Sequence, residues 1–503
     1  MHSQIKVFLF IFLVYNFTSA GIYVSPNGDD TNSGSFDFPL KSIALAITKV
    51  QPGDTIYLKG GIYNLSTKIS ISLNGSEEQK YHLFAYNEER PILDFSSMDV
   101  NSSNRGISLS GSYWYLKGFD IKGAGDNGMH ISGSYNRIEF CAFYENKDTG
   151  LQLGNGASNN QIINCDSYFN ADLTQGNADG FAPKLDVGTN NYFYGCRAWQ
   201  NSDDGWDGYM RGNNDVNTTL ENCWCFANGY LKDGSASSGN GNGYKMGGSD
   251  DKTLMHNFSL VNCLAFDNRV RGFDQNSNKG AMTIYNCSAY RNGTNYSIST
   301  ELNAGKTAII ANCISVGSYG SLGSFVIQQT NSWQSPFIVT FGDFISLDTL
   351  GVKSSRKSDG SLPDIAFFHL AAGSDLIDAG TNIGLPFNGS APDLGAFENG
   401  MPSKIISEKI MDDFRILQNY PNPFNPSTKF VYHLDFPQNV KLEIFNLLGE
   451  KLTELINEYQ NAGDYEVDWS AEAENDQFLS AGIYIVRLST NNHLSSIKIS
   501  LIK

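Results

Sequence analysis

CAFYEN, at residues 141–146, is the first copy of a hexapeptide that returns along the chain and decides the fold. Later copies keep the cysteine, an aromatic residue three positions on and an asparagine five positions on, and they read CDSYFN (165–170), CRAWQN (196–201), CWCFAN (223–228), CLAFDN (263–268) and CSAYRN (287–292). A degenerate seventh copy begins at Cys313, so seven of the eight cysteines occupy one repeat position. Such regular self-similarity predicts a solenoid in which each copy belongs to one coil.

A second pattern alternates with the first, in which a glycine precedes a large apolar or aromatic residue. The pairs are Gly128-Met129, Gly150-Leu151, Gly180-Phe181, Gly205-Trp206, Gly243-Tyr244 and Gly272-Phe273. Each period of roughly 22–40 residues therefore holds two short strand-like segments. Between Pro91 and Pro336 the only proline is Pro183, as parallel ladders require. We expect an all-β chain whose main part, residues 21–399, is a right-handed parallel β-helix.

In a parallel β-helix, equivalent residues of successive coils lie about 4.8 Å apart. Cysteine should therefore stack on cysteine, aromatic on aromatic and asparagine on asparagine. We expect each asparagine amide to donate a hydrogen bond to a carbonyl of the next coil, which satisfies polar groups buried at a tight bend. This spacing exceeds the roughly 3.8 Å between the Cβ atoms of a disulfide, so the stacked cysteines are predicted to be buried free thiols. A disulfide framework is the alternative.

The two ends of this region have other patterns. Residues 1–20 read as a signal peptide, with Lys6, an apolar run and the small residues Thr18-Ser19-Ala20 before a predicted cleavage site. Residues 39–50 predict an amphipathic helix that caps the first coil. Residues from about 315 to 399 lose the repeat, and we expect them to fold back along or over the last coils.

Composition limits the partners. The chain has 503 residues with 35 Lys+Arg and 52 Asp+Glu, a formal net charge of −17, which argues against nucleic acid as a partner. The apolar run of the leader is shorter than the roughly 20 residues that span a bilayer, and no later run is longer, so no membrane span is predicted. We expect a secreted monomer.

Residues 400–413 read as a linker, and residues 414–503 follow a pattern of alternating polar and apolar positions that predicts a small antiparallel β-sandwich. This last region resembles the C-terminal sorting domain of the bacterial type IX secretion system, through NYPNPFNPST (419–428), NLLGE (446–450) and AGIYIVRL (481–488). The resemblance implies that the type IX machinery is a partner and that the protein is extracellular or on the outer cell surface. A carbohydrate-binding sandwich is the alternative.

The chemistry concentrates in two consecutive coils that are rich in carboxylates. Asp179 and Asp204 each precede a register glycine, and Asp203 and Asp207 flank them. Four carboxylates this close repel one another unless some are protonated or a cation joins them, and an all-oxygen set favours calcium. Lys245 lies two positions past Gly243, the register of Asp207 one coil earlier, so a lysine is predicted beside the metal. The alternatives are a purely structural calcium or a solvated acidic turn.

This constellation resembles the pectate lyases of polysaccharide lyase family 9. The resemblance extends to QPGDTIYLKGG (51–61), GSDLIDAG (373–380) and APDLGAFE (391–398). In that family the calcium ligands are an upstream Asp and an Asp-Asp-x-x-Asp motif with a backbone carbonyl, and a lysine one coil later is the base. Carried over to the matching positions, this implies the metal ligands Asp179, Asp203, Asp204, the carbonyl of Gly205 and Asp207, and the catalytic residue Lys245.

The implied activity is calcium-dependent cleavage of α-1,4-galacturonan in polygalacturonate or pectin by β-elimination, which yields 4,5-unsaturated oligogalacturonides. Cations near the cluster should bind the substrate carboxylates, and the candidates are Arg211, Arg269, Arg271 and Lys279. Arg271 is favoured because it occupies the register of Asp204, and its pairing with Asp274 is the alternative.

Other functions stay open at this point. The chain could be a lyase of another polyuronide, or a glycoside hydrolase in which paired carboxylates act without calcium and Lys245 has no role. It could also be a non-catalytic, calcium-stabilised β-solenoid that binds polysaccharide.

Overall fold

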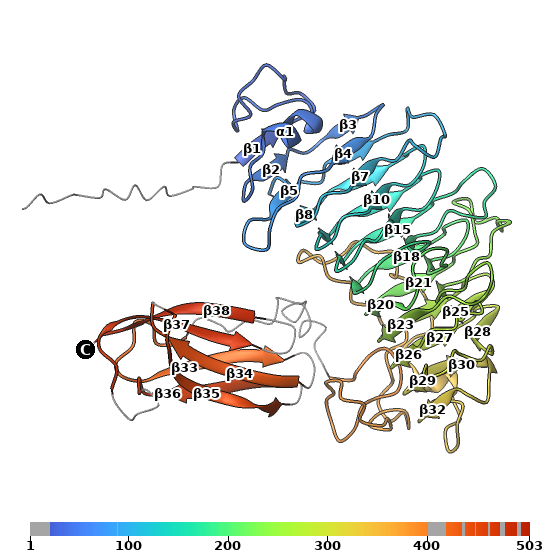
Figure 1. Cartoon of the computed structure of the whole chain (residues 1–503). Helices are drawn as coiled ribbons and strands as arrows, with labels where there is room; N and C mark the ends of the chain where they lie inside the picture. Colours follow the sequence, from blue (N-terminus) through green and yellow to red (C-terminus); the bar gives the residue numbers. More distant parts are fainter. Residues whose placement is uncertain are drawn as a thin grey trace, which may run out of the picture. The chain divides into compact units, whose positions relative to one another are not determined.

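The computed structural model (Figure 1) describes residues 21–400 except 88, and residues 419–502 except 435–437, 448, 461–462, 473–477 and 490–493. The predicted signal peptide, and the predicted linker apart from Gly400, lie outside these residues. The chain divides into two compact units, residues 1–401 and 402–503, and each is described by itself.

The first unit is a parallel β-helix of three sheets, and the chain visits sheets A, B and C in turn, so that three consecutive strands form one coil (Figure 1). The predicted solenoid is therefore confirmed. Sheet A contains, in spatial order, β1 (Gly21–Val24), β2 (Thr55–Leu58), β5 (Tyr81–Ala85), β8 (Trp114–Lys117), β11 (Arg137–Glu139), β14 (Gln161–Ile163), β17 (Asn191–Tyr194), β20 (Val216–Glu221), β23 (His256–Val261), β26 (Met282–Tyr285), β29 (Ala308–Ala311) and β32 (Ile327–Gln329).

The other two sheets are built in the same way. Sheet B contains β3 (Ile62–Asn64), β6 (Ile92–Asp94), β9 (Asp120–Lys122), β12 (Ala142–Tyr144), β15 (Asp166–Tyr168), β18 (Arg197–Trp199), β21 (Trp224–Phe226), β24 (Leu264–Phe266), β27 (Ser288–Tyr290) and β30 (Ile314–Val316). Sheet C contains β4 (Ile69–Ile71), β7 (Ile107–Leu109), β10 (Met129–Ile131), β13 (Leu151–Leu153), β16 (Phe181–Pro183), β19 (Trp206–Asp207), β22 (Tyr244–Lys245), β25 (Arg271–Asp274), β28 (Thr294–Ile298) and β31 (Gly320–Leu322).

The bend from sheet A to sheet B uses one residue with a left-handed backbone, directly before each repeat cysteine. These residues are Phe140, Asn164, Gly195, Asn222, Asn262, Asn286 and Asn312, with φ between 49° and 61°. Asparagine and glycine tolerate this conformation best, which explains why they dominate the position. The bend turns the following cysteine inward, and all eight cysteines are buried free thiols. The prediction of a thiol stack without disulfides is confirmed.

The asparagine ladder lies at the bend from sheet B to sheet C. Asn170 Nδ2 donates to Oδ1 of Asn201 at 2.9 Å, and Asn201 Nδ2 donates to Oδ1 of Asn228 at 3.0 Å. The acceptor in the next coil is thus a side-chain carbonyl, and each amide also donates to a backbone carbonyl of the preceding coil, as Asn201 does to Ser167 at 3.2 Å. The ladder continues from Asn146 to Asn292 and satisfies amides that are almost fully buried as far as Asn268 and partly buried at Asn292.

Aromatic residues also stack from coil to coil, as the repeat predicts. On sheet B the ring centroids of Tyr168 and Trp199 are 4.3 Å apart, and those of Phe226 and Phe266 are 4.8 Å apart. A second stack, on the inner side of sheet C, joins the residues that follow the register glycines, for example Trp206 and Tyr244 at 5.1 Å. The sheet C stack and the aliphatic rows of sheet A form the core, whereas the sheet B stack belongs to a separate apolar cluster.

The helix expected near the N-terminus is α1 (Ile43–Lys49), capped by the side chain of Ser42. It buries Ile43, Ala46 and Ile47 against β1 and β4 at the first coil. The predicted cap over the open end of the solenoid is confirmed, since this helix covers a coil that has no preceding neighbour.

The segment that closes the helix begins later than expected, because coils continue to β32 (Ile327–Gln329). Beyond it, residues 333–400, which include the 3-10 helix η1 (Phe341–Asp343), pack Phe367, Phe368 and Leu394 over the aromatic stack of sheet B. Arg197 and Arg356 both bind Asp166, at 2.8 Å and 2.6 Å. Burial raises the pKa of Asp166, but the two guanidinium groups outweigh this and lower it to about 2. The expected fold-back over the last coils is confirmed.

The second unit is a small antiparallel β-sandwich. One sheet pairs β33 (Thr428–Leu434) with β36 (Gly463–Trp469), and the other has the order β35 (Lys451–Gln460), β34 (Gln438–Phe445), β37 (Gly482–Ser489) and β38 (Leu494–Leu501). Both sheets contribute to one core that includes Phe430, Leu442 and Val486. Neither helix of the described residues is long and apolar enough to cross a membrane.

We predict that Asn201→Ala lowers the free energy of unfolding by about 3 kcal/mol, because it removes the acceptor of the buried Asn170 backbone N–H and Nδ2 and one of the donors to Asn228 Oδ1. Equilibrium denaturation in urea measures the change. Asn27→Ala, at an exposed position, is the control and should change stability by less than about 0.5 kcal/mol. Equal effects of the two substitutions would contradict a stabilising ladder.

Candidate active site

Four aspartates lie at the bend between sheets B and C, in two successive coils. Asp179, Asp203 and Asp204 lie in the bends that lead into β16 and β19, and Asp207 ends β19. Their exposed fractions are 0%, 2%, 0% and 5%. One oxygen each of Asp179, Asp204 and Asp207 lie within 4.8 Å of one another. The structure therefore brings three of the four predicted carboxylates together, and Asp203 lies next to this triad in the chain without belonging to it.

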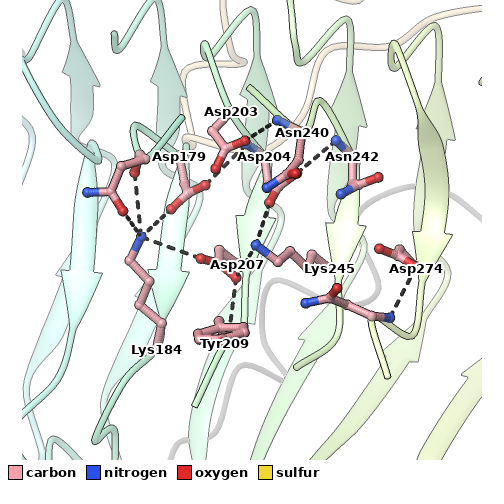
Figure 2. A network of polar contacts seen from close by, with 12 residues as sticks. Asp179, Lys184, Asp203, Asp204, Asp207, Tyr209, Asn240, Asn242, Lys245 and Asp274 are labelled. Carbon is pink, nitrogen blue, oxygen red and sulfur yellow. Dashed lines mark hydrogen bonds and ion pairs between the residues drawn. The ribbon is translucent and has the colours of Figure 1, made fainter. Parts of the chain in front are cut away.

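Backbone N–H groups orient each carboxylate. Asp204 N–H donates to Asp179 Oδ1 at 3.1 Å, and Tyr209 N–H donates to Asp207 Oδ1 at 3.0 Å. Asn240 and Asn242, one coil later, donate their N–H groups to Oδ1 of Asp203 and of Asp204, the latter at 2.8 Å (Figure 2). Each carboxylate is therefore held by a rigid part of the ladder or of a neighbouring loop, which preorganises the cluster.

Lys245 lies beside the cluster as the register predicts. Tyr244 pairs with Trp206 and Lys245 with Asp207 in the parallel ladder from β19 to β22. Lys245 Nζ is 3.1 Å from Asp204 Oδ2 and 3.2 Å from Asp207 Oδ1. It also lies 5.6 Å from the centre of the Tyr209 ring.

A second buried lysine enters the cluster from the opposite side of Asp207 (Figure 2). Lys184 Nζ lies 2.6 Å from Asp179 Oδ2 and 3.4 Å from Asp207 Oδ2. Lys184 directly follows β16, at a position outside both repeat patterns. Its closeness to two carboxylates appears only in the folded chain.

The site is electrostatically crowded. Burial raises the pKa of Asp204 to about 7, and its aspartate neighbours reinforce the rise against the attraction of Lys245. Burial also raises the pKa of Asp179, and the other three carboxylates add to it. For Lys245 burial lowers the pKa, but the four carboxylates outweigh burial and the pKa lies well above its usual value. In the absence of a further cation, Lys245 is therefore an ammonium group over the whole physiological range.

The donors present fit a hard divalent cation. Asp204 Oδ2 is buried and accepts no hydrogen bond, even though Lys245 Nζ lies 3.1 Å away. The buried Oδ1 of the neighbouring Asn242 also accepts none. The Gly205 carbonyl accepts a ladder hydrogen bond from Phe181 N–H at 2.9 Å, so it would offer a cation its second lone pair. Oxygen donors of this kind suit calcium.

The Gly/Ser-rich residues 229–242, the 229–242 loop, form part of the site. Ser237 Oγ donates to the carbonyl of Ser202, and Arg269 Nη2 donates to the carbonyl of Gly239 and, at 3.4 Å, to that of Asn240. From the sequence we expected Arg269 to bind substrate. The structure places its guanidinium against the loop, where it holds the segment whose N–H groups orient Asp203 and Asp204.

The other predicted cations lie outside the cluster. Arg271, on the strand next to Lys245, pairs with Asp274 at 3.1 Å and keeps 43% of its side chain exposed. Arg211 is 61% exposed and lies 3.4 Å from Asp250. Lys279 donates to the backbone carbonyl of Glu301 at 2.8 Å. Tyr209, which the sequence analysis did not single out, contributes the ring beside Lys245 and an N–H group to Asp207.

Comparisons with known proteins agree with this architecture. Residues 22–312 match the family model described as "Pel9A-like, right handed beta helix region", and residues 418–503 match the "Secretion system C-terminal sorting domain". Pectate lyase L of Dickeya chrysanthemi is 39% identical over 390 residues, which cover 75% of this chain and 90% of the relative. The right-handedness expected from the repeat agrees with the first of these family models.

Two solved structures are also similar. The crystal structure of pectate lyase Pel9A has a TM-score of 0.71 and 38% identity, covering 76% of this chain and 97% of the other. A rhamnogalacturonan lyase has a TM-score of 0.62 and 26% identity, covering 70% of this chain and 96% of the other.

We predict that Asp203→Ala and Asp207→Ala each weaken calcium binding by at least about tenfold, because each would remove one of the anionic ligands expected from the sequence. Isothermal titration calorimetry measures the affinity, and circular dichroism should show an intact fold because the core stacks are untouched. Asp37→Ala, at an exposed position, should leave calcium binding unchanged. Wild-type affinity in both cluster variants would exclude this metal site.

Proposed function

The chain belongs to the Pel9A-like right-handed β-helix family and is a polysaccharide lyase; we propose that it is a calcium-dependent pectate lyase with Lys245 as general base. Its substrate would be the α-1,4-galacturonan of polygalacturonate and pectin. The observation that carries the proposal is the buried triad of Asp179, Asp204 and Asp207, two of whose carboxylates contact a lysine on the adjacent strand. The sorting domain makes the chain a secreted or cell-surface protein, and we propose the type IX machinery as its export partner.

An anionic substrate explains why such a site needs a cation. The chain has a formal net charge of −17 and the polymer is a polyanion, so the two repel unless positive charge lies between them. Asp179, Asp203, Asp204, Asp207 and the Gly205 carbonyl would hold calcium. When bound, calcium would draw electron density from the uronate carboxylate and so acidify the hydrogen on C5.

The chain's own residues would carry the proton transfer. The neutral amine of Lys245 takes the proton from C5, and the electron pair of that bond forms the double bond between C4 and C5. O4 leaves with the electrons of the C4–O4 bond and takes a proton from water. Asp204 and Asp207 position the Lys245 side chain, and the Tyr209 ring limits its other side.

Two exposed arginines are the proposed contacts to substrate carboxylates. Arg271 is the first residue of β25. Asp274, the last residue of the same strand, pairs with Lys245 in the parallel ladder. Because Asp274 engages only one edge of the guanidinium, Arg271 can still bind a second carboxylate. Arg211 lies near the Tyr209 ring, and most of its side chain is exposed.

One assay tests the reaction class. We predict that polygalacturonate with calcium yields a new ultraviolet absorbance from 4,5-unsaturated products, and that a chelator abolishes it. Reducing ends without absorbance would indicate a hydrolase, and neither signal would indicate a binding protein or another substrate. The similarity to a rhamnogalacturonan lyase favours a second polyuronide candidate, so rhamnogalacturonan is assayed in parallel.

We predict that Lys245→Arg lowers turnover by at least about 100-fold while calcium and oligogalacturonate still bind, because a guanidinium keeps its charge but does not accept the proton. Lys279→Arg is the matched control and should turn over like the wild type. Near wild-type turnover of Lys245→Arg would place the base elsewhere.

For the wild type we predict a rate that rises with pH into the alkaline range, because the raised pKa keeps Lys245 protonated at neutral pH. At a higher calcium concentration the rising part of the profile should move to lower pH, since the cation offsets the carboxylates that raise this pKa. A pH profile that does not respond to calcium would contradict this coupling.

A further inference from the structure

The two buried lysines of the site differ in what surrounds their ammonium groups. Lys184 Nζ faces Asp179 Oδ2 at 2.6 Å, Asp207 Oδ2 at 3.4 Å, and the backbone and side-chain oxygens of Asn177, both at 3.5 Å. An ammonium group has three N–H donors, so this environment uses all of them. Lys245 has two carboxylate partners and the face of an aromatic ring.

We propose that Lys184 is a counter-charge of the metal centre, a positioning residue that holds Asp179 and Asp207 together when no metal is bound. The inference rests on the proposed function only in taking these aspartates as calcium ligands. It divides the work between the lysines: Lys245 acts on the substrate, and Lys184 bridges Asp179 and Asp207.

Formal charge supports this role. Four carboxylates and two ammonium groups leave the cluster with a net charge of −2, which one divalent cation neutralises. Without Lys184 the metal-free cluster would carry −3 within a buried bend, and the repulsion between Asp179 and Asp207 would no longer be offset by an ammonium group that contacts both. Lys184 should therefore stabilise the metal-free protein and moderate its affinity for calcium.

The test is Lys184→Met, which keeps the length of the side chain and removes its charge. In excess chelator at pH 8, the melting temperature of the variant should fall by several degrees relative to the wild type. In calorimetric titration with calcium, the variant should bind about tenfold tighter than the wild type, because the cation meets one more uncompensated carboxylate. Tighter binding is a result that a purely structural lysine would not produce.

Two further variants keep the test interpretable. Asp179→Asn combined with Lys184→Met removes both members of the shorter ion pair and should regain most of the melting temperature in chelator. Lys147→Met, at an exposed position of a neighbouring coil, should change neither quantity.

The outcomes separate this inference from the proposed function. If the wild type binds no calcium, the metal site itself fails. If the wild type binds calcium but Lys184→Met binds it equally or more weakly, or melts in chelator like the wild type, the counter-charge role is overturned. Loss of the polygalacturonate signal in Lys245→Arg tests the base and is independent of both results.

Discussion

Parallel backbone hydrogen bonding between successive coils is the constraint on which the rest of the structure depends. It holds equivalent residues one strand spacing apart and so turns a sequence repeat into a column. One such column, at the bend next to the site, consists of Asn170, Asn201 and Asn228. Another column, in the core of the solenoid, contains Trp206 and Tyr244. The same register sets Asp207 beside Lys245, so the chemistry of the site uses the geometry that builds the core.

The features whose positions recur from coil to coil were predictable from the sequence. The cysteine, aromatic and asparagine positions predict the coils, and the register of the glycines that precede large apolar residues predicts the neighbouring carboxylates and lysine. The helix at residues 39–50 and the sandwich after residue 414 were predictable from amphipathic patterns. The expected end of the repeat near residue 315 was too early, because β31 and β32 pair normally in sequences that lack the hexapeptide.

Features that do not repeat could not be predicted from the sequence. Lys184 follows β16 without an equivalent in other coils, so no alignment of coils relates it to Asp179 and Asp207. The 229–242 loop returns to the cluster through the N–H groups of Asn240 and Asn242, and backbone donors leave no trace in the side-chain pattern. The contact of Arg269 with this loop depends on that same conformation.

The 229–242 loop also bears on how such a protein can diversify. It lies within a coil that spans 38 residues between Gly205 and Gly243, whereas Gly128 and Gly150 are only 22 residues apart, yet Trp206 and Tyr244 still pair in register. Extra residues inserted at this bend therefore leave the ladder unchanged on both sides. Evolution can lengthen this loop ahead of Asn240, and with it change the surface offered to a polymer, while the N–H groups of Asn240 and Asn242 still orient Asp203 and Asp204.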